Sequence, residues 1–277
     1  MARRILKAGF ALKAHDKNPN ALRTVLDAGA SAIQSFRDLA ECEAVLIMVN
    51  TMDQVHEVLI GEGGLVPCLK GQGLPLIIVM STVSPDHILA LASTLAPHSA
   101  RILDAPVSGG PFLAELGRLA IMAGGQEDEL EHIRPVFEAM ADHIFHVGPL
   151  GTGMAMKLVN NCIGLAMTLA VPEALALGRA SGLDMERMVE IINASSGKTF
   201  LTENWPLIKV FLGMVLEKED TFGARNALFT TGMKDLKTAQ QWAAGKGFAT
   251  PVLDSVAKAL ELLREEDVLE NITMILK

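Results

Sequence analysis

The feature that most constrains how this chain can fold is an alternation of apolar runs and helical segments. One glycine-rich turn that normally belongs to this pattern is missing. Short apolar runs recur from the first residues to about residue 147, and a helical pattern separates most of them. This rhythm is typical of a dinucleotide-binding α/β domain. In such a domain the turn after the first strand reads Gly-x-Gly-x-x-Gly and holds a pyrophosphate. No such glycine triplet occurs in this sequence, because every Gly-x-Gly pair lacks the third glycine.

The first ten residues resemble the later turns of an amphipathic helix, and an extended run ending at His15 follows them. We therefore expect a strand and a glycine turn, roughly a dozen residues, to precede residue 1. Loss of that central strand would leave buried N–H and C=O groups unpaired, at about 1–3 kcal/mol each. The alternative is a catalytically inactive remnant that acts at most as an oligomerising or binding module.

The alternation stops at Gly148-Pro149-Leu150-Gly151, a turn that is a plausible domain boundary. We predict a Rossmann-like α/β domain with a parallel sheet over residues 1–150 and an all-helical domain over residues 151–277. A long helix from Gly153 to about Ser181 is expected to join them. The predicted strands are Phe10–His15, Ala44–Val49, Leu76–Met80, Arg101–Leu103, Leu119–Met122 and Ile144–Val147. One further helix is predicted to end near Asn193. Three more are predicted to cover roughly Leu201–Leu216, Leu228–Lys246 and Pro251–Arg264.

Composition narrows the class of protein. Half of the residues are hydrophobic, and the net charge of −8 disfavours a nucleic-acid partner. Three cysteines without a Cys-x-x-Cys pair indicate reduced thiols in a cytoplasmic protein. Leu158–Leu177 is apolar but contains two asparagines, a proline and a glutamate, so we expect a buried helix and no membrane span. The seven histidines show no metal-ligand spacing, and we predict no metal.

Three predicted cofactor contacts follow strands, where open α/β sheets bind ligands. Asp16 follows the first run and could accept hydrogen bonds from ribose hydroxyls, which would favour NAD over NADP, although Lys17 weakens that preference. Asn50 and Thr82 follow two later strands and could face a ribose or nicotinamide. The alternatives are a solvated turn for Asp16 and helix capping at Thr82 or its serine neighbours.

Two segments carry candidate substrate contacts. Ser108, Gly109 and Gly110 offer a hydroxyl and unshielded N–H groups suited to a carboxylate, or else form a flexible surface loop. Lys157, Asn160 and Asn161 share one face of an otherwise apolar helix, since they stand at i, i+3 and i+4. Desolvation there would lower the pKa of the lysine and suit it to proton transfer. The alternative is a solvent-facing polar stripe.

Taken together and in this order, these segments resemble the β-hydroxyacid dehydrogenases, the 3-hydroxyisobutyrate dehydrogenase family. The resemblance covers essentially the whole chain. Its segments are Met1–Phe10, Val79–Pro85, Asp104–Gly110, Gly117–Gly125, Lys157–Asn161 and Lys234-Asp235-Leu236. Three departures stand out: Asn50 replaces a frequent proline, Val79 replaces a frequent acid, and the initial strand with Gly-x-Gly-x-Met-Gly is missing.

The resemblance implies a role for each candidate. Lys157 would be the catalytic acid and base, and Asn161, with Asn160 as a weaker candidate, would orient the substrate. Ser108–Gly110 would hold the substrate carboxylate. Thr82 would contact the nicotinamide ribose, and Lys234, which otherwise reads as part of an exposed charged face, would border cofactor and substrate.

The expected function is therefore NAD-dependent interconversion of a short 3-hydroxy acid and its semialdehyde, of the 3-hydroxyisobutyrate or tartronate semialdehyde type. NADP remains possible as the cofactor. The resemblance also implies a homodimer or homotetramer that binds a small carboxylate substrate. Imine reduction on the same fold is a weaker expectation, because a catalytic lysine suits a reacting oxygen.

Overall fold

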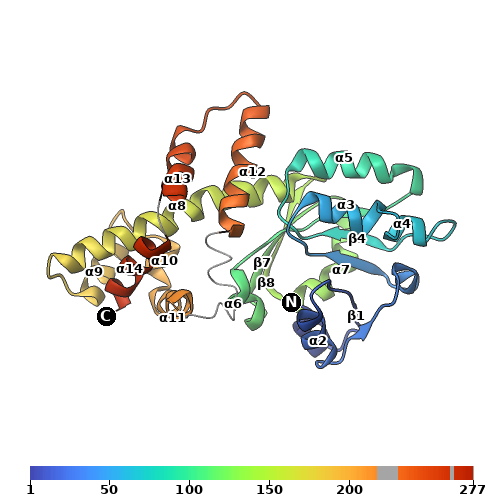
Figure 1. Ribbon diagram of the computed structural model, residues 1–277, viewed down its shortest axis with the longest axis horizontal. Coiled ribbons are helices and arrows are strands. Elements are labelled where there is room, and N and C mark those ends of the chain that lie inside the picture. Colours follow the sequence, from blue (N-terminus) through green and yellow to red (C-terminus); the bar gives the residue numbers. More distant parts are fainter. Residues whose placement is uncertain (217–229, 263–264, 277) are drawn as a thin grey trace. The chain divides into compact units, whose positions relative to one another are not determined.

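The computed structural model describes residues 1–216, 230–262 and 265–276, and the chain forms two compact units, Met1–Lys157 and Leu158–Lys277 (Figure 1). In the first unit the strands are β1 (Lys13–Ala14), β2 (Ser31–Ala32), β3 (Ala44–Ile47), β4 (Leu76–Val79), β5 (Ile102–Asp104), β6 (Val107–Ser108), β7 (Leu119–Gly124) and β8 (Ala141–Gly148). Its helices are α1 (Ala2–Lys7), α2 (Pro19–Leu26), η1 (Phe36–Leu39), α3 (Met52–Ile60), α4 (Leu65–Cys68), α5 (Pro85–Leu95), η2 (Ala96–His98), α6 (Gly110–Leu116) and α7 (Glu127–Glu138).

Six strands form the main sheet in the order β3-β4-β5-β7-β6, with β8 paired to β7. The pairs β3–β4, β4–β5 and β7–β8 are parallel, as predicted, whereas β7 runs antiparallel to β5 and β6. The strands β1 and β2 form a separate two-stranded parallel sheet. The predicted strand Phe10–His15 is reduced to β1, and the two-residue strands β2 and β6 were not predicted because they are too short to show a period.

Helices cover both faces of the main sheet, which explains why β4 is buried at every residue. Leu76 and Ile78 point into a core shared with α1 and α7, including Ile5 and Phe137. Ile77 and Val79 point into the opposite core, which is shared with α3, α4 and α5. Figure 1 shows these helices on the two sides of the sheet. A continuous apolar run therefore specifies a strand that is enclosed on both faces.

Local signals set several helix starts. At α2 the Asn18 side chain accepts hydrogen bonds from two backbone N–H groups, and Pro19 occupies the first helical position. At α3 Thr51 and Gln54 form a reciprocal capping box. These caps set the starts of α2 and α3 a few residues after the ends of β1 and β3.

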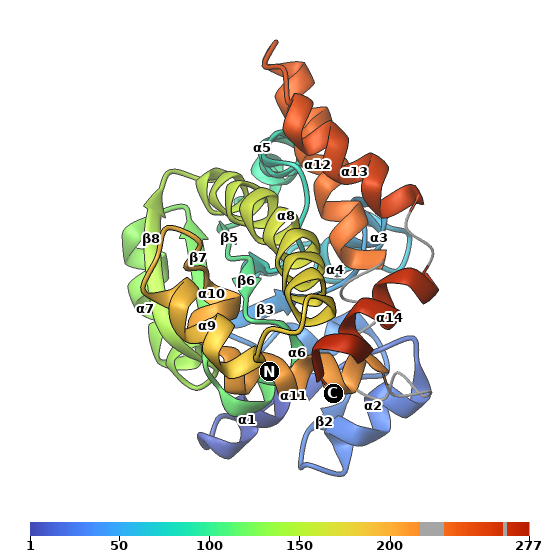
Figure 2. The ribbon, with the colours of Figure 1, turned by 90° about the vertical axis from the view of Figure 1, so that its left-hand side faces the viewer.

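The longest element, α8 (Thr152–Ala180), begins in the first unit and continues into the second; it runs from yellow-green to yellow in Figure 2. The second unit also contains α9 (Met185–Asn193), α10 (Phe200–Glu203), α11 (Trp205–Leu216), α12 (Gly232–Gly245), α13 (Pro251–Leu262) and α14 (Glu265–Leu276). One core joins α8, α9, α11 and α14 around the buried Trp205. A smaller core joins α8, α12 and α13 around Leu236. The all-helical architecture is as predicted.

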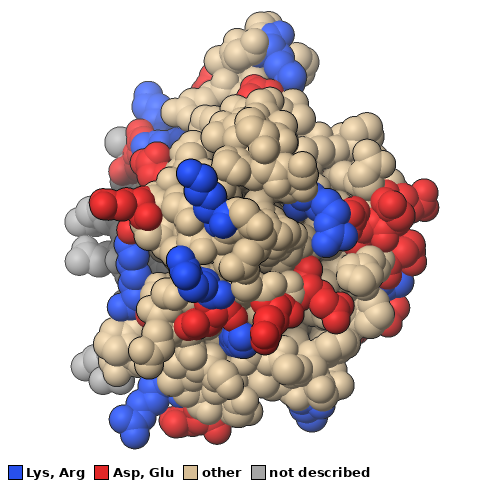
Figure 3. Space-filling model, turned by 90° about the vertical axis from the view of Figure 1, so that its right-hand side faces the viewer, with Lys and Arg blue, Asp and Glu red and all other residues tan. Residues whose placement is uncertain are grey.

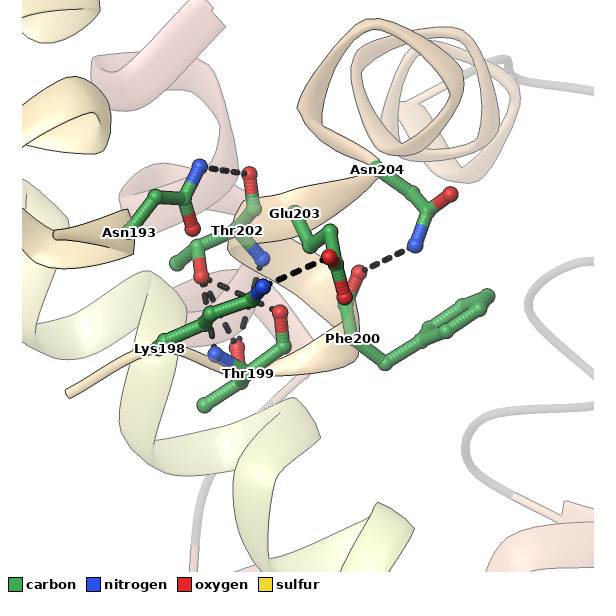
Figure 4. Close-up of polar contacts among 7 residues, drawn as sticks. All are labelled: Asn193, Lys198, Thr199, Phe200, Thr202, Glu203 and Asn204. Atoms are coloured by element: carbon green, nitrogen blue, oxygen red, sulfur yellow. Dashed lines mark hydrogen bonds and ion pairs between the residues drawn. The ribbon is translucent and has the colours of Figure 1, made fainter. Parts of the chain in front are cut away.

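The turn between α9 and α10 is held by short-range polar contacts (Figure 4). Thr199 caps α10 and exchanges hydrogen bonds with Thr202, whose carbonyl accepts a bond of 3.0 Å from the Asn193 amide. Lys198 and Glu203 form an ion pair of 2.7 Å across the same turn. The predicted helix over residues 201–216 is divided at Asn204 into α10 and α11.

Two expectations for the helical region need correction. Helix α8 (Thr152–Ala180), which contains the stretch Leu158–Leu177, is long and apolar enough to cross a membrane by length and composition, a test that core helices of soluble proteins also pass. It is not buried throughout, because Val159, Ile163 and Leu177 are exposed.

The helix α14 was not predicted. The predicted helix ends at residues 228–229 and 263–264 lie outside the described residues.

Candidate functional site

The carboxyl ends of β3, β4 and β5 lie at one edge of the sheet because the three strands are parallel. Asn50 follows β3, and its backbone N–H donates to the Gln54 side chain at 2.8 Å. Thr82 follows β4. The buried Ser81 hydroxyl, next to Thr82, accepts a hydrogen bond of 2.7 Å from the Val49 N–H. This bond links the segment after β4 to the segment after β3. Two predicted cofactor residues therefore occupy the sheet edge where such folds bind ligands.

Asp16 lies in an exposed turn after β1. Its carboxylate accepts the Asn18 N–H at 2.8 Å, so it participates in the turn that starts α2. The neighbouring Lys17 ammonium lies 2.7 and 2.8 Å from the two carboxylate oxygens of Glu57 on α3. The turn role that we considered for Asp16 is therefore present, and the adjacent cation has an acidic partner.

The segment Ser108–Gly110 leads from β6 into α6. Gly109 and Gly110 have φ angles of +130° and +67°, a region that L side chains rarely adopt. A β-carbon at Gly109 would also lie 3.0 Å from atoms of Leu113 and Leu119. The sharp turn therefore depends on consecutive glycines, and their backbone is unshielded by side chains of their own.

Lys157 lies in the second turn of α8 and is only 8 % exposed. The start of this helix is anchored by Asp104, the last residue of β5, which is fully buried. Burial raises the pKa of Asp104 to about 6, while hydrogen bonds from backbone N–H groups, including those of Gly151 and Met154, lower it. Sequence reasoning did not select Asp104 as a site residue. Its position at the end of a buried apolar run was the available signal.

In the second unit Asn161 donates to the carboxylate of Asp235 on α12 at 2.7 Å. The other carboxylate oxygen of Asp235 lies 2.9 Å from the Lys234 ammonium. The Asn160 amide donates to the Asn161 side-chain oxygen at 3.3 Å. The predicted residues Asn160, Asn161 and Lys234 are thus brought together by Asp235, which is 3 % exposed and which we had not selected. The signal that could have identified Asp235 is its place in the sequence, directly between Lys234, which was predicted, and the apolar Leu236.

The described residues contain no group of three or more His, Cys, Asp or Glu side chains that could hold a metal ion. On the face drawn in Figure 3, acidic and basic side chains are intermingled and form no extended surface of one sign. The side chains that the candidate site offers are amides, hydroxyls and amines, which can bind an anion, orient a ligand and transfer a proton.

Comparisons with known proteins decide the family. Residues 1–148 match the NAD binding domain of 6-phosphogluconate dehydrogenase, and residues 151–273 match the family described as NAD-binding of NADP-dependent 3-hydroxyisobutyrate dehydrogenase. An NAD-dependent L-serine dehydrogenase of Pseudomonas aeruginosa is 32% identical over 275 residues, which are 98% of this chain and 90% of that protein. The chain belongs to the 3-hydroxyisobutyrate dehydrogenase-like β-hydroxyacid dehydrogenases.

Other members of this β-hydroxyacid dehydrogenase family support the assignment. The 3-hydroxyisobutyrate dehydrogenase of Pseudomonas aeruginosa is 34% identical over 210 residues, covering 74% of this chain and 70% of that protein. A structure described as Mycobacterium tuberculosis 3-hydroxyisobutyrate dehydrogenase with L-serine superposes with a TM-score of 0.74 at 26% identity, covering 97% and 93% of the two chains. The predicted family, fold class, NAD-type cofactor and dehydrogenase activity class are confirmed.

The described residues fit part of a nicotinamide dinucleotide. Asn50 and Thr82 follow the adjacent strands β3 and β4, and Asp16 follows β1; in open α/β sheets ligands bind outside the carboxyl ends of the strands. The sequence contains no Gly-x-Gly-x-x-Gly triplet of the kind that holds a pyrophosphate.

Proposed function

We propose that this β-hydroxyacid dehydrogenase interconverts a 3-hydroxypropanoate that carries a substituent at C2 and the corresponding semialdehyde. Relatives are named for L-serine, 3-hydroxyisobutyrate and 2-(hydroxymethyl)glutarate. These three molecules share a carboxylate and a primary alcohol on the two sides of C2, and they differ in the C2 substituent. The shared part defines the proposed substrate class.

The proposed roles rest on the resemblance to the family and on the chemistry of the side chains. Backbone N–H groups of Ser108–Gly110 and the Ser108 hydroxyl bind the substrate carboxylate. Asn161, with Asn160 beside it, orients the substrate, and Lys234 borders the cofactor and substrate. The Asp235 carboxylate holds the Asn161 side chain in place, because an oxygen of that carboxylate accepts a hydrogen bond from the Asn161 amide nitrogen.

Lys157 performs the proton transfer in this proposal. A bound nicotinamide, NAD in preference to NADP, supplies the hydride chemistry. During oxidation the neutral Lys157 amine removes the proton from the C3 hydroxyl oxygen, and during reduction the ammonium returns a proton to the carbonyl oxygen. The position of Lys157 carries this assignment, because its side chain is only 8 % exposed and lies in the same unit as Ser108–Gly110.

The test is turnover of the full chain on four alcohols with NAD and, separately, NADP: 3-hydroxyisobutyrate, L-serine, 2-(hydroxymethyl)glutarate and glycerate. We expect at least one to be oxidised, and we expect Lys157→Ala to lower kcat at least a thousandfold while the Kd for the cofactor changes less than threefold. Lys70→Ala, an exposed lysine in the same unit, is the matched control.

Two outcomes would contradict the proposal. Turnover of Lys157→Ala at the wild-type rate would remove Lys157 from the mechanism. Reduction of a cyclic imine by a protein that turns over none of the four acids would assign the chain to imine chemistry instead.

We also propose that the protein is a cytoplasmic homodimer or homotetramer. Val159, Ile163 and Leu177 are 46%, 55% and 70% exposed along α8, an apolar surface on which a second copy could pack. The three cysteines are unpaired, as expected for a reducing compartment. Light scattering should give a mass of two or four chains, and Ile163→Asp should lower it; a monomeric wild type would contradict the proposal.

A further inference from the structure

Asp104 joins the end of β5 to the first turn of α8. Its Oδ1 accepts the Gly151 N–H at 2.7 Å, and its Oδ2 accepts the Met154 N–H at 2.6 Å. The first N–H groups of a helix have no acceptor within the helix, and a negative charge at that end is favoured by the helix dipole. One buried carboxylate therefore satisfies two such donors and ties the helix start to the sheet.

Two glycines allow this junction to be close-packed. A β-carbon at Gly153 would clash with the Met122 carbonyl oxygen and would lie 2.9 Å from the Asp104 carboxylate. A β-carbon at Gly124 would lie 2.5 Å from that carboxylate and 2.8 Å from the Gly153 nitrogen. The backbones of β7 and α8 thus approach each other as closely as residues without side chains permit. Any movement of the helix start would require movement of backbone in the sheet.

Lys157 lies three residues beyond Met154, about one helical turn from the anchored end. Met154 and Leu158, on either side of it, are completely buried. Successive turns of a helix move together as a rigid element. The position of the first turn of α8 therefore determines the position of the Lys157 α-carbon, from which the side chain extends.

We propose that Asp104 is the positioning residue for Lys157: its carboxylate holds the first turn of α8 against the sheet and thereby sets the placement of the lysine relative to Ser108–Gly110. The catalytic consequence rests on the function proposed above, whereas the structural consequence does not. A displacement of about 1 Å in a reacting group can cost on the order of a hundredfold in rate.

The test compares Asp104→Asn with Asp184→Asn. Asparagine keeps the size of the side chain but presents an NH₂ donor to one of the two N–H groups. Asp184 caps α9 through the Arg187 N–H at 2.9 Å, so its variant also loses a helix-capping carboxylate, but away from α8. We expect Asp104→Asn to lower kcat by about ten- to a hundredfold, with KM and the cofactor Kd within threefold of wild type. We expect Asp184→Asn to leave kcat unchanged.

A second measurement does not depend on turnover. Lysines of the folded protein are acylated with a limiting dose of acetic anhydride, and the modified peptides are quantified by mass spectrometry. In Asp104→Asn we expect the reaction rate of Lys157, relative to the exposed Lys7 and Lys70, to rise about fivefold. General destabilisation would also expose the buried Lys157, so the ratio is compared with that of Asp184→Asn, which loses a helix cap away from α8 and should leave the ratio unchanged.

An unchanged Lys157 ratio in folded Asp104→Asn would overturn the proposal, even if stability falls. A wild type without turnover would contradict the proposed function, and the labelling ratio would still decide the role of Asp104. If Asp104→Asn does not fold, hydrogen exchange of the wild type decides: amides of residues 151–157 should be protected as strongly as those of β4, and exchange typical of a frayed helix end would overturn the anchor.

Discussion

The Asn161 amide donates to the carboxylate of Asp235 at 2.7 Å and so links α8 to α12 within the second unit. The same carboxylate pairs with the Lys234 ammonium, and almost none of it is accessible to solvent. A buried carboxylate is tolerated only when polar partners replace its lost hydration. The two sequence motifs that contain these residues, far apart along the chain, are therefore parts of one polar network.

Asn161→Ala should lower the free energy of unfolding by about 1.5–3 kcal/mol, because a hydrogen bond to a buried charged acceptor is lost. Urea denaturation measures the change. Asn204→Ala is the control, since the Asn204 amide donates to the Phe200 carbonyl in an exposed turn (Figure 4). Losses of equal size in the two variants would show that Asp235 does not depend on Asn161.

Two glycines of the same helix should respond oppositely to alanine. At Gly153 a β-carbon would clash with the Met122 carbonyl, so Gly153→Ala should destabilise the fold by about 1–3 kcal/mol. At Gly164 nothing lies within 4 Å of the added carbon, so Gly164→Ala should stabilise α8 by about 0.5–1 kcal/mol. Thermal unfolding of both variants is the measurement, and a Gly153→Ala protein as stable as wild type would contradict the close packing at the junction.

The raised pKa of Asp104 predicts an unusual pH dependence. Its folded-state pKa is about 6, against an ordinary value of 3.8. Between these values the folded protein holds a proton that the unfolded chain has released, so this group adds stability as the pH falls below about 6 and withdraws it as the pH rises. Relative to Asp104→Asn, wild type should gain about 1 kcal/mol between pH 7 and pH 5. Urea titrations at both pH values test this, and a constant difference would rule it out.

Glu57 should influence the choice between NAD and NADP. Its carboxylate pairs with the Lys17 ammonium beside Asp16, and both partners are largely exposed. Glu57→Ala would release the ammonium for a 2′-phosphate, but exposed pairs contribute only about 0.2–1 kcal/mol. We therefore expect the ratio of Kd for NADP to Kd for NAD to fall by about two- to fivefold. Glu41→Ala, an exposed acid of the same unit, should leave the ratio unchanged.

Long periodic elements were predictable from local patterns. The apolar runs of β3 and β4 and the helix from Thr152 were identified because burial on two faces, or along a helix, imposes a period on many residues. The strands β2 and β6, two residues each, have no period to detect. The antiparallel course of β7 beside β5 depends on a connection through β6 and α6 that local pattern does not encode.

The same division holds at the candidate site. Lys157, Asn160 and Asn161 could be grouped from their spacing alone, since residues three and four apart share a helix face. Asp104 and Asp235 could not be, because their importance comes from partners 50 and 74 positions away along the chain. Residue order and periodicity thus predicted the class of fold and the candidate reacting side chains, and the resemblance predicted the family. Only the folded chain shows the partners of these two carboxylates, because burial and long-range hydrogen bonds exist only once distant segments have packed together.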